Sequence, residues 1–306
     1  MGLMTEIDFQ KIEPEWLEPI DAHLESVSLM TRPERLFVNG LIRHFKPKKI
    51  LEVGVWTGTG TCVVLNAMKD MPETRLHSID LLSTIPKNHP QNTAGQDKNI
   101  GYMASEMFPQ ALKSGRGGIW TLHRGQRSEK VLDQVGDGID FVVLDADHDL
   151  PGEIIDFLLI LPRTTEDCVF VLHDINITLT NRSRQIMGVN RHRCGRLLMS
   201  TVTADKCYPK LGNPLDFNDE QSQVLLKKVQ DKSVPNIGAF RVGPETRRTE
   251  HLADLFNYFL MVWFSFFGFQ DFVNIDNMFR RYYPDQLVNL FEIGFNYNAF
   301  IRSAKK

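Results

Sequence analysis

Short apolar runs alternate with longer segments of helical periodicity from about residue 48 onward. The runs cover residues 48–53, 75–80, 118–123, 139–145 and 168–173. The last two are apolar almost throughout, which is typical of strands that are covered on both faces. Strands that alternate with helices form a parallel sheet. The pattern therefore predicts an α/β fold with a doubly wound, Rossmann-like, mostly parallel sheet, and a final run at 237–242 is expected to close the sheet edge.

The two ends of the chain depart from this alternation. Residues 31–45 predict a helix that is opened by a capping box of Thr31 and Glu34, and another helix precedes it. The longest apolar run, 255–269, has 15 residues and six phenylalanines, whereas a bilayer span needs roughly 20 residues. It predicts a buried helix or half of a subunit interface in a homo-oligomer, and interfacial membrane anchoring is the alternative. We therefore divide the chain into an N-terminal helical segment (1–46), a Rossmann-like domain (47–243) and an aromatic-rich helical extension (244–306).

Composition excludes several classes of protein. An apolar content of 42% in 306 residues is ordinary for a globular chain and excludes disorder and fibres. A net charge of −3 gives no global basic field for nucleic acid. The four cysteines form no CxxC pair, and the acidic N-terminus lacks the features of a secretion signal. We therefore expect a cytoplasmic protein with no membrane span and no nucleic-acid partner.

The first strand ends in a glycine-rich loop, LEVGVWTGTG at 51–60. Gly54, Gly58 and Gly60 let the backbone turn sharply and lie against a ligand. Three residues separate the first two glycines, whereas a dinucleotide fingerprint has one, and the bulky Trp56 would crowd a pyrophosphate. A carboxylate at Glu52 instead suits a ligand that carries an amino group. Trp56 either packs on that ligand or belongs to the core.

The second strand also closes on an acid, in RLHSID, 28 residues after the first. Asp80 is placed to accept hydrogen bonds from both hydroxyls of a ribose, because a carboxylate only accepts. The alternative is that Asp80 caps a helix. The loop and this acid together predict a nucleoside ligand whose other half carries an amino group.

The chemically densest segments follow the fourth and fifth strands, LDADHD at 144–149 and LHDIN at 172–176. Ligands of open α/β sheets bind beyond the carboxyl ends of the strands. Five titratable side chains are therefore expected to converge beside the ligand: Asp145, Asp147, His148, His173 and Asp174. Carboxylates this close repel one another, and a proton, an arginine or a divalent cation relieves the repulsion.

Taken together, these motifs resemble the class I S-adenosylmethionine-dependent methyltransferases. Their order over residues 48–175 is similar to that of the macrocin-type sugar O-methyltransferases and, more distantly, of catechol O-methyltransferase. The resemblance implies S-adenosyl-L-methionine as cofactor, with Glu52, the loop and Asp80 holding it. It also implies that Asp145, beside the reactive methyl, is a magnesium ligand, and that Asp147 is the candidate base. Gly125 and Ser128 fall where relatives line the adenine, although Gly125 is equally well explained as a turn.

One position departs from the sugar enzymes. His173 stands where they have their first aspartate after the fifth strand, so that Asp174 matches the second. A divalent cation held by Asp145, His173 and Asp174, magnesium or manganese, is one interpretation. A second is a metal-free site in which His148 or His173 takes the proton directly. A third is that these polar residues are structural.

The sequence does not identify the methyl acceptor. Residues 83–99 follow Asp80 without clear periodicity and are interpreted as a lid. Residues 176–217 carry five arginines, either a solvated face or a grip for an anionic acceptor such as a phosphorylated or nucleotide-linked sugar: Arg182, Arg184, Arg191, Arg193 and Arg196. The leading hypothesis is an O-methyltransferase acting on a hydroxyl of a small polar acceptor, a sugar or glycan precursor. The rivals are a nicotinamide-dependent oxidoreductase and a non-catalytic cofactor-binding or assembly module.

Overall fold

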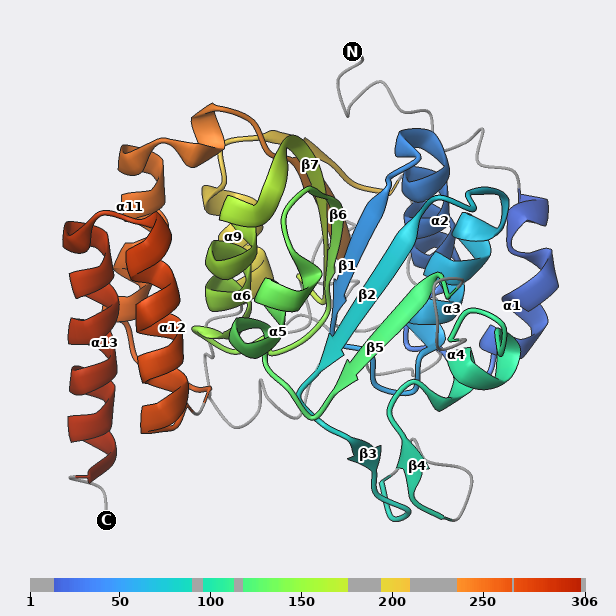
Figure 1. Cartoon of the computed structure of the whole chain (residues 1–306), viewed down its shortest axis with the longest axis horizontal. Helices are drawn as coiled ribbons and strands as arrows, with labels where there is room; N and C mark the ends of the chain where they lie inside the picture. Colours follow the sequence, from blue (N-terminus) through green and yellow to red (C-terminus); the bar gives the residue numbers. More distant parts are fainter. Residues whose placement is uncertain are drawn as a thin grey trace, which may run out of the picture.

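A mostly parallel sheet of seven strands forms the centre of the molecule (Figure 1). The computed structural model describes residues 14–89, 96–112, 118–175, 194–209, 236–265 and 267–303. In spatial order the strands are β5 (Trp120–Arg124), β2 (Arg75–Asp80), β1 (Lys49–Val53), β6 (Ile139–Leu144), β7 (Thr164–His173), β9 (Ile237–Arg241) and β8 (Asp205–Cys207). The first five are parallel, whereas β9 runs antiparallel to both β7 and β8.

The doubly wound architecture predicted from the sequence is confirmed. The five predicted parallel strands are present, shifted by at most a few residues at their ends. One detail is wrong: the run at 237–242 does not close the sheet, because β9 lies between β7 and β8. The edge position belongs to β8, which has three residues and no alternation of polar and apolar side chains.

Helices cover both faces of the sheet (Figure 1). One face carries α1 (Glu18–Leu24), α2 (Arg32–Phe45), α3 (Thr59–Ala67) and α4 (Tyr102–Met107). The other carries α5 (Ser128–Val135), α6 (Gly152–Ile160) and α9 (Cys194–Thr201), and outside them lie α11 (Thr249–Asn257), α12 (Phe269–Tyr282) and α13 (Asp285–Ser303). Short 3₁₀ turns occupy Pro14–Trp16, Met68–Asp70, Leu161–Arg163, Glu245–Arg247 and Tyr258–Leu260 (η7).

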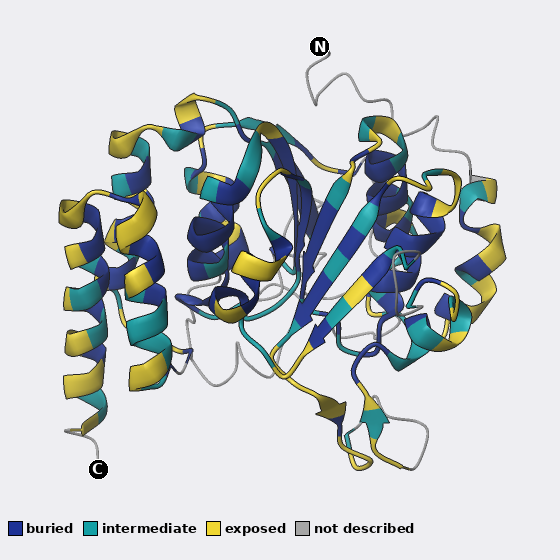
Figure 2. Ribbon diagram, in the orientation of Figure 1, coloured by how far each residue is buried: buried dark blue, intermediate teal, exposed yellow. Residues whose placement is uncertain are grey.

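Burial explains why β6 and β7 are apolar. Both strands lie in the middle of the sheet with helices on each side. All but one residue of β6 and the last six residues of β7 are buried (Figure 2). Parallel sheets covered on both faces need such continuous apolar runs. Two core clusters result, one under α2 and α3 and a larger one that joins α6 to the C-terminal helices.

The N-terminal capping box is present as predicted. The backbone N–H of Thr31 donates to Glu34 Oε2 at 2.7 Å, and α2 begins at the next residue. The predicted single helix over 255–269 is wrong. That run contains the end of α11, the turn η7, residues 261–265 with neither helix nor strand, and the first residue of α12.

The segment predicted to be a lid, residues 83–99, has a short strand near each end, and the two strands pair with each other. Strands β3 (Thr84–Ile85) and β4 (Lys98–Asn99) pair antiparallel just beyond Asp80, and residues 90–95 lie outside the described part of the chain. No helix within the described ranges combines the length and apolar character needed to cross a bilayer.

Candidate active site

The carboxyl ends of β1, β2, β6 and β7 meet at one edge of the sheet, and the predicted site residues lie on the loops that follow them. The loop after β1 makes a sharp turn in which Gly54 and Gly58 have φ of +92° and +90°. A Cβ on Gly54 would lie 1.9 Å from the carbonyl oxygen of Asp145. The glycine is therefore required because the loops after β1 and β6 touch backbone to backbone. Gly60 is different, since it lies within α3 and a Cβ there would meet its nearest neighbour at 3.5 Å.

Asp80 holds the glycine loop in place. Its Oδ2 accepts the backbone N–H groups of Val55 and Trp56, both at 2.9 Å, and its Oδ1 accepts that of Leu82 at 2.8 Å. A carboxylate has about four lone-pair positions, so these three bonds leave Oδ1 able to accept once more. The sequence left open whether Trp56 packs on the ligand or belongs to the core. Its ring packs edge-on against His89, at 4.7 Å between ring centroids.

Glu52 lies buried behind the loop and is 2% exposed. It accepts hydrogen bonds from the hydroxyls of Ser78 at 2.6 Å and Thr61 at 2.8 Å. Burial raises the pKa of the Glu52 carboxyl to about 7 despite these bonds, and the charges of Asp145 and Asp80 add to the effect. Near neutral pH this carboxyl is thus close to half protonated.

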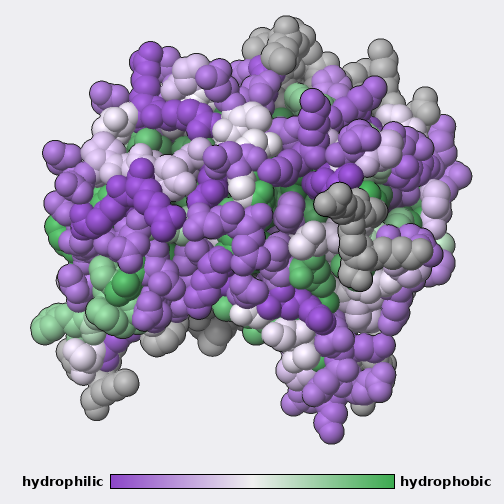
Figure 3. All heavy atoms as spheres, in the orientation of Figure 1, coloured by the Kyte–Doolittle hydropathy of each residue, from purple (hydrophilic) through white to green (hydrophobic). Residues whose placement is uncertain are grey.

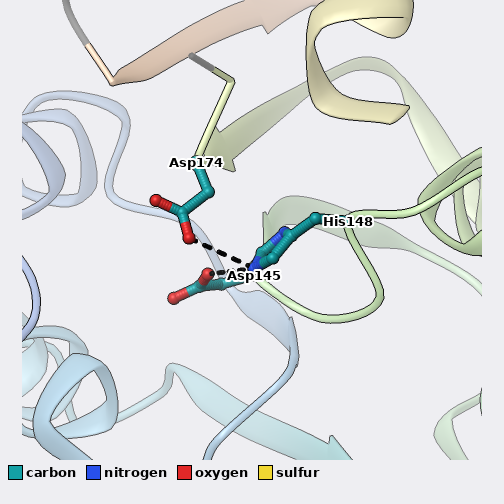
Figure 4. Close-up of side chains that lie close together, drawn as sticks. All are labelled: Asp145, His148 and Asp174. Atoms are coloured by element: carbon teal, nitrogen blue, oxygen red, sulfur yellow. Dashed lines mark ion pairs between the residues drawn. The ribbon is translucent and has the colours of Figure 1, made fainter. Parts of the chain in front are cut away.

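Three of the predicted titratable side chains come together at the site. Oxygen atoms of Asp145 and Asp174 and a ring nitrogen of His148 all lie within 4.8 Å of one another (Figure 4). His148 Nε2 is 3.3 Å from Asp174 Oδ2 and 3.7 Å from Asp145 Oδ1. The three side chains are 18–29% exposed, so the cluster faces a partly open space.

A buried glutamate fixes the orientation of His148. Glu153 in the first turn of α6 is 0% exposed, and its Oε1 lies 2.9 Å from His148 Nδ1. The other ring nitrogen therefore points at the two aspartates. Burial by itself would lower the pKa of His148, but the carboxylates of Glu153, Asp145 and Asp174 outweigh it and raise the pKa to about 10.

His173 lies behind this cluster. It is the last residue of β7 and 3% exposed, with Nδ1 at 3.1 Å from Asp145 Oδ1 and Nε2 at 3.7 Å from Glu34 Oε2. Burial opposes its protonation, but Asp145 and Glu34 raise the pKa of His173 well above the usual value. His173 connects Asp145 to the capping box of α2, and His148 takes the position in the three-residue cluster that the sequence assigned to His173.

Asp174 leaves the strand in an unusual backbone conformation. Its φ of +53° lies in the left-handed region, which is sparsely populated by residues other than glycine. Asn236 Nδ2 donates to its Oδ1 at 2.6 Å, while Oδ2 faces His148. The turn sends Asp174 towards the cluster instead of continuing the strand.

The remaining candidates lie apart from this cluster. Asp147 sits against the start of α6, and burial raises the pKa of its carboxyl. The hydroxyl of Ser128 donates to Asp156 at 2.6 Å. Gly125 has a φ of +69°, and a Cβ there would lie 2.5 Å from Ser83 Oγ. Of the five predicted arginines, Arg196 alone lies within the described ranges.

Sequence reasoning missed three residues that complete the site. Glu34 was interpreted only as a capping residue, and no role was assigned to Glu153 or Asn236. The capping motif could have drawn attention to Glu34, but nothing in the sequence indicates that α2 begins beside β7. Glu153 carried no signal beyond being an acid in the first turn of a helix.

Comparison with known proteins supports the architecture of this region. Residues 51–175 match the family model described as a methyltransferase domain. No curated protein matches the chain. The match covers the glycine loop, Asp80, the cluster and the strands that carry them, and it ends next to Asp174.

Solved structures with related folds include the O-methyltransferase TomG from Streptomyces achromogenes, bound to S-adenosylmethionine. It is 17% identical, with 76% of this chain and 91% of that chain covered and a TM-score of 0.42. An O-methyltransferase from Bacillus cereus is 14% identical, with 75% and 90% covered and a TM-score of 0.42. Methyltransferase PaMTH1 from Podospora anserina is 15% identical, with 77% and 87% covered and a TM-score of 0.36. Likeness at this level carries no argument about activity.

The seven-stranded sheet, the loop at the end of its first strand and the acid at the end of its second define a class I methyltransferase fold. Residues 51–175 of this chain are similar to a methyltransferase domain, and the strand order of the sheet agrees with that similarity. This assignment favours the leading sequence hypothesis over the nicotinamide-dependent oxidoreductase.

Proposed function

We propose that the protein is an O-methyltransferase that acts on a hydroxyl of a small polar acceptor with the help of a divalent cation. The observation that carries this proposal is the cluster of Asp145, His148 and Asp174 next to the cofactor loop. Because Gly54 touches the backbone of Asp145, a ligand over the glycine loop would lie beside the cluster. An acceptor oxygen held there would be close to the methyl group.

The cofactor would be held by side chains at the ends of β1 and β2. Asp80 retains one lone-pair position on Oδ1 for a ribose hydroxyl. A cationic amino group near Glu52 would favour the ionised carboxylate. The glycine loop would lie against the ligand. Gly54 and Gly58 have a positive φ and close neighbours, whereas at Gly60 the protein itself leaves room for a Cβ.

The donor set fits a divalent cation. Two carboxylates and one imidazole suit manganese or a later transition metal better than magnesium, which prefers oxygen. The Glu153 carboxylate behind His148 is the outer partner that metal-bound histidines usually have, and it aims Nε2 at the aspartates. Asn236 fixes Asp174 in the same way, and His173 fixes Asp145.

The metal-free alternative is less well supported. A general base must be unprotonated at working pH, whereas the pKa of His148 is raised to about 10. Protonated His148 offsets part of the charge of the neighbouring carboxylates, and a divalent cation that displaced the Nε2 proton would offset more of it. When bound, it would polarise the acceptor hydroxyl and lower its pKa. Asp147 stays a candidate base only if substrate binding brings its carboxyl towards the acceptor.

The acceptor is proposed from the narrower resemblance. The order of motifs over residues 48–175 is similar to that of macrocin-type enzymes, which supports a sugar or glycan precursor and a role in glycan biosynthesis. An anionic acceptor, phosphorylated or nucleotide-linked, would suit the arginines, of which Arg196 in α9 is described. The described cysteines are free and buried, and they support the proposal of a cytoplasmic enzyme.

A homo-oligomer through the C-terminal helices is proposed as well. The outer face of α13 carries Ile293, Tyr297 and Phe300, which are 56%, 50% and 69% exposed, and Phe269 at the start of α12 is 72% exposed. Figure 3 shows apolar surface at this side of the molecule, where α12 and α13 lie. Exposed apolar residues at helical spacing favour a contact with another helix.

Manganese binding and methyl transfer test the proposed function. Manganese binding is measured by electron paramagnetic resonance on the wild type, on Asp174→Asn and on Asp147→Asn as the matched control from the same site region. We expect Asp174→Asn to weaken binding by at least tenfold and Asp147→Asn to leave it nearly unchanged. Transfer of labelled methyl from S-adenosylmethionine to a library of hydroxyl compounds, including nucleotide sugars, is then measured with manganese and with a chelator. Wild-type protein that binds no manganese, or that methylates equally well under chelation, would refute the metal role.

A further inference from the structure

A stretch of the C-terminal extension reaches back to the loop that carries two cluster residues. Residues 261–265, which we call the strap, connect η7 to the segment before α12. The backbone N–H groups of Phe264 and Ser265 both donate to the carbonyl oxygen of Leu150, at 2.8 and 3.1 Å. The Ser265 hydroxyl donates to the carbonyl oxygen of Asp149 at 2.7 Å.

The loop held in this way, residues 145–151, begins with Asp145 and contains His148. Its two ends are fixed by the sheet and by α6, since the backbone N–H of Asp145 donates to Val53 at 2.9 Å. The carbonyl of His148 accepts from the backbone N–H of Cys194 at 3.0 Å. Between these points the strap supplies three hydrogen bonds to two successive carbonyls. It therefore restrains the part of the loop next to His148.

The strap is itself held by α13. Asn298 is 3% exposed, accepts the backbone N–H of Trp263 at 2.7 Å and donates to the carbonyl of Met261 at 3.0 Å. Arg302, one helical turn further on, donates to the carbonyls of Ser265 at 2.7 Å and Trp263 at 3.3 Å. The polar side chains of one helix thus fix the backbone of the strap on the side away from the site.

The strap and α13 share a cavity as well as these hydrogen bonds. A cavity of about 300 Å³ lies there. Its lining comes from Trp263 of the strap, from Phe267 two residues before α12, and from α13, including Phe295, Asn298 and Arg302. Trp263 of the strap packs against Phe291 and Phe295 of α13, at 5.8 and 6.1 Å between ring centroids, and the hydrogen bonds of Asn298 and Arg302 fix the strap backbone beside this contact.

We propose that the strap is a positioning element of the active site, and that Arg302 and Asn298 act on Asp145 and His148 through it. The C-terminal extension is then part of the catalytic apparatus although it touches no reacting group. The inference rests on the proposed function where it concerns metal binding, and on hydrogen bonds alone where it concerns the order of the loop.

The experiment compares Arg302→Met with Arg280→Met. Both changes remove a guanidinium and keep an apolar stem of similar length. Arg280 in α12 pairs with Asp276 of its own helix at 2.9 Å, and it joins α12 to α13 through Asp285 at 3.0 Å and through Glu292. Its ion pairs lie within these two helices and do not involve the strap. Hydrogen–deuterium exchange of peptides covering residues 145–152 is measured with the full chain, and manganese affinity is measured on the same samples.

We expect Arg302→Met to speed exchange in residues 145–152 by about fivefold or more, since one lost hydrogen bond changes an opening equilibrium by about that factor. Manganese affinity should fall by a similar factor, while Arg280→Met changes neither quantity. Ser265→Ala removes the hydroxyl that bonds to Asp149 and keeps the backbone hydrogen bonds of the strap to Leu150. It should show a smaller effect in the same direction, which keeps the test decisive if Arg302→Met does not fold.

The outcomes separate the two proposals. Exchange at the wild-type rate in both Arg302→Met and Ser265→Ala, or equal acceleration in Arg280→Met, would overturn the positioning role. Wild-type protein that binds no manganese would instead overturn the metal proposal, and the exchange measurement would still decide whether the strap orders the loop.

Discussion

Replacing Glu52 by glutamine tests whether the carboxyl behind the glycine loop is held in its protonated form. Its pKa is raised from an ordinary 4.5 to about 7 in the folded protein, with burial as the largest cause. In the unfolded chain the carboxyl regains its ordinary value. Between these two values the folded protein keeps a proton that the unfolded chain has lost, so the free energy of unfolding falls as pH rises.

The size of the effect follows from the shift. Each unit of pKa difference is worth about 1.4 kcal/mol, so Glu52 lowers the free energy of unfolding by about 3 kcal/mol between pH 4 and pH 8. Glutamine cannot ionise. The stability of the variant relative to the wild type should therefore rise by about 3 kcal/mol from pH 4 to pH 8. The amide also changes the hydrogen bonds to Ser78 and Thr61, but that cost is the same at every pH.

Urea denaturation at half-unit steps from pH 4 to pH 8 measures this difference. Glu106→Gln removes one acid whose side chain is 63% exposed and is the matched control. The control curve should run nearly parallel to the wild type. A constant offset between Glu52→Gln and the wild type across the whole pH range would refute the reasoning about this carboxyl.

Two further predictions concern packing and assembly. Gly54→Ala should prevent stable folding or cost at least about 3 kcal/mol in chemical denaturation, because its φ is +92° and its Cβ would overlap the carbonyl of Asp145. Gly60→Ala is the matched control and should be neutral or stabilising by up to about 1 kcal/mol while weakening cofactor binding, and equal tolerance of both changes would contradict the close approach. Tyr297→Glu should convert an oligomer to monomers in light scattering coupled to size exclusion, and Glu250→Lys on α11 should not. A wild type that is monomeric at all concentrations would contradict the proposed α13 contact.

The sheet could be predicted because burial on both faces leaves a strong pattern. Runs such as Phe141 to Leu144 are apolar at every position, and no other element type explains so short a run between helices. Strand β8 has no such pattern, so its edge position and the inner position of β9 could not be seen. The run at 255–269 has a strong apolar pattern, and yet the single helix predicted from it is wrong. Four of its aromatic residues are buried, Phe256, Phe259, Trp263 and Phe267, but polar contacts from Asn298 hold the strap in a non-helical conformation where a helix was expected.

The candidate site was partly predictable for a topological reason. Parallel strands end at one edge, so Asp145 and Asp174 had to lie near one another. Which histidine joins them depends on details that the sequence does not reveal. His173 continues β7 and turns inward, Asp174 leaves the strand with a φ of +53°, and His148 returns on a loop that Glu153 orients. Glu34 comes from far along the chain, and only the packing of α2 against the sheet brings it to His173.

A crystal structure with S-adenosylhomocysteine and manganese tests the central claim most directly. Anomalous diffraction locates the ion without reference to the protein density. We expect an anomalous peak bounded by Asp145, His148 and Asp174, with the cofactor ribose at Asp80 and its sulfur facing that ion. Cofactor bound at the glycine loop with no anomalous peak, or a peak elsewhere, would contradict the metal-assisted mechanism, and cofactor absent from that loop would contradict the account as a whole.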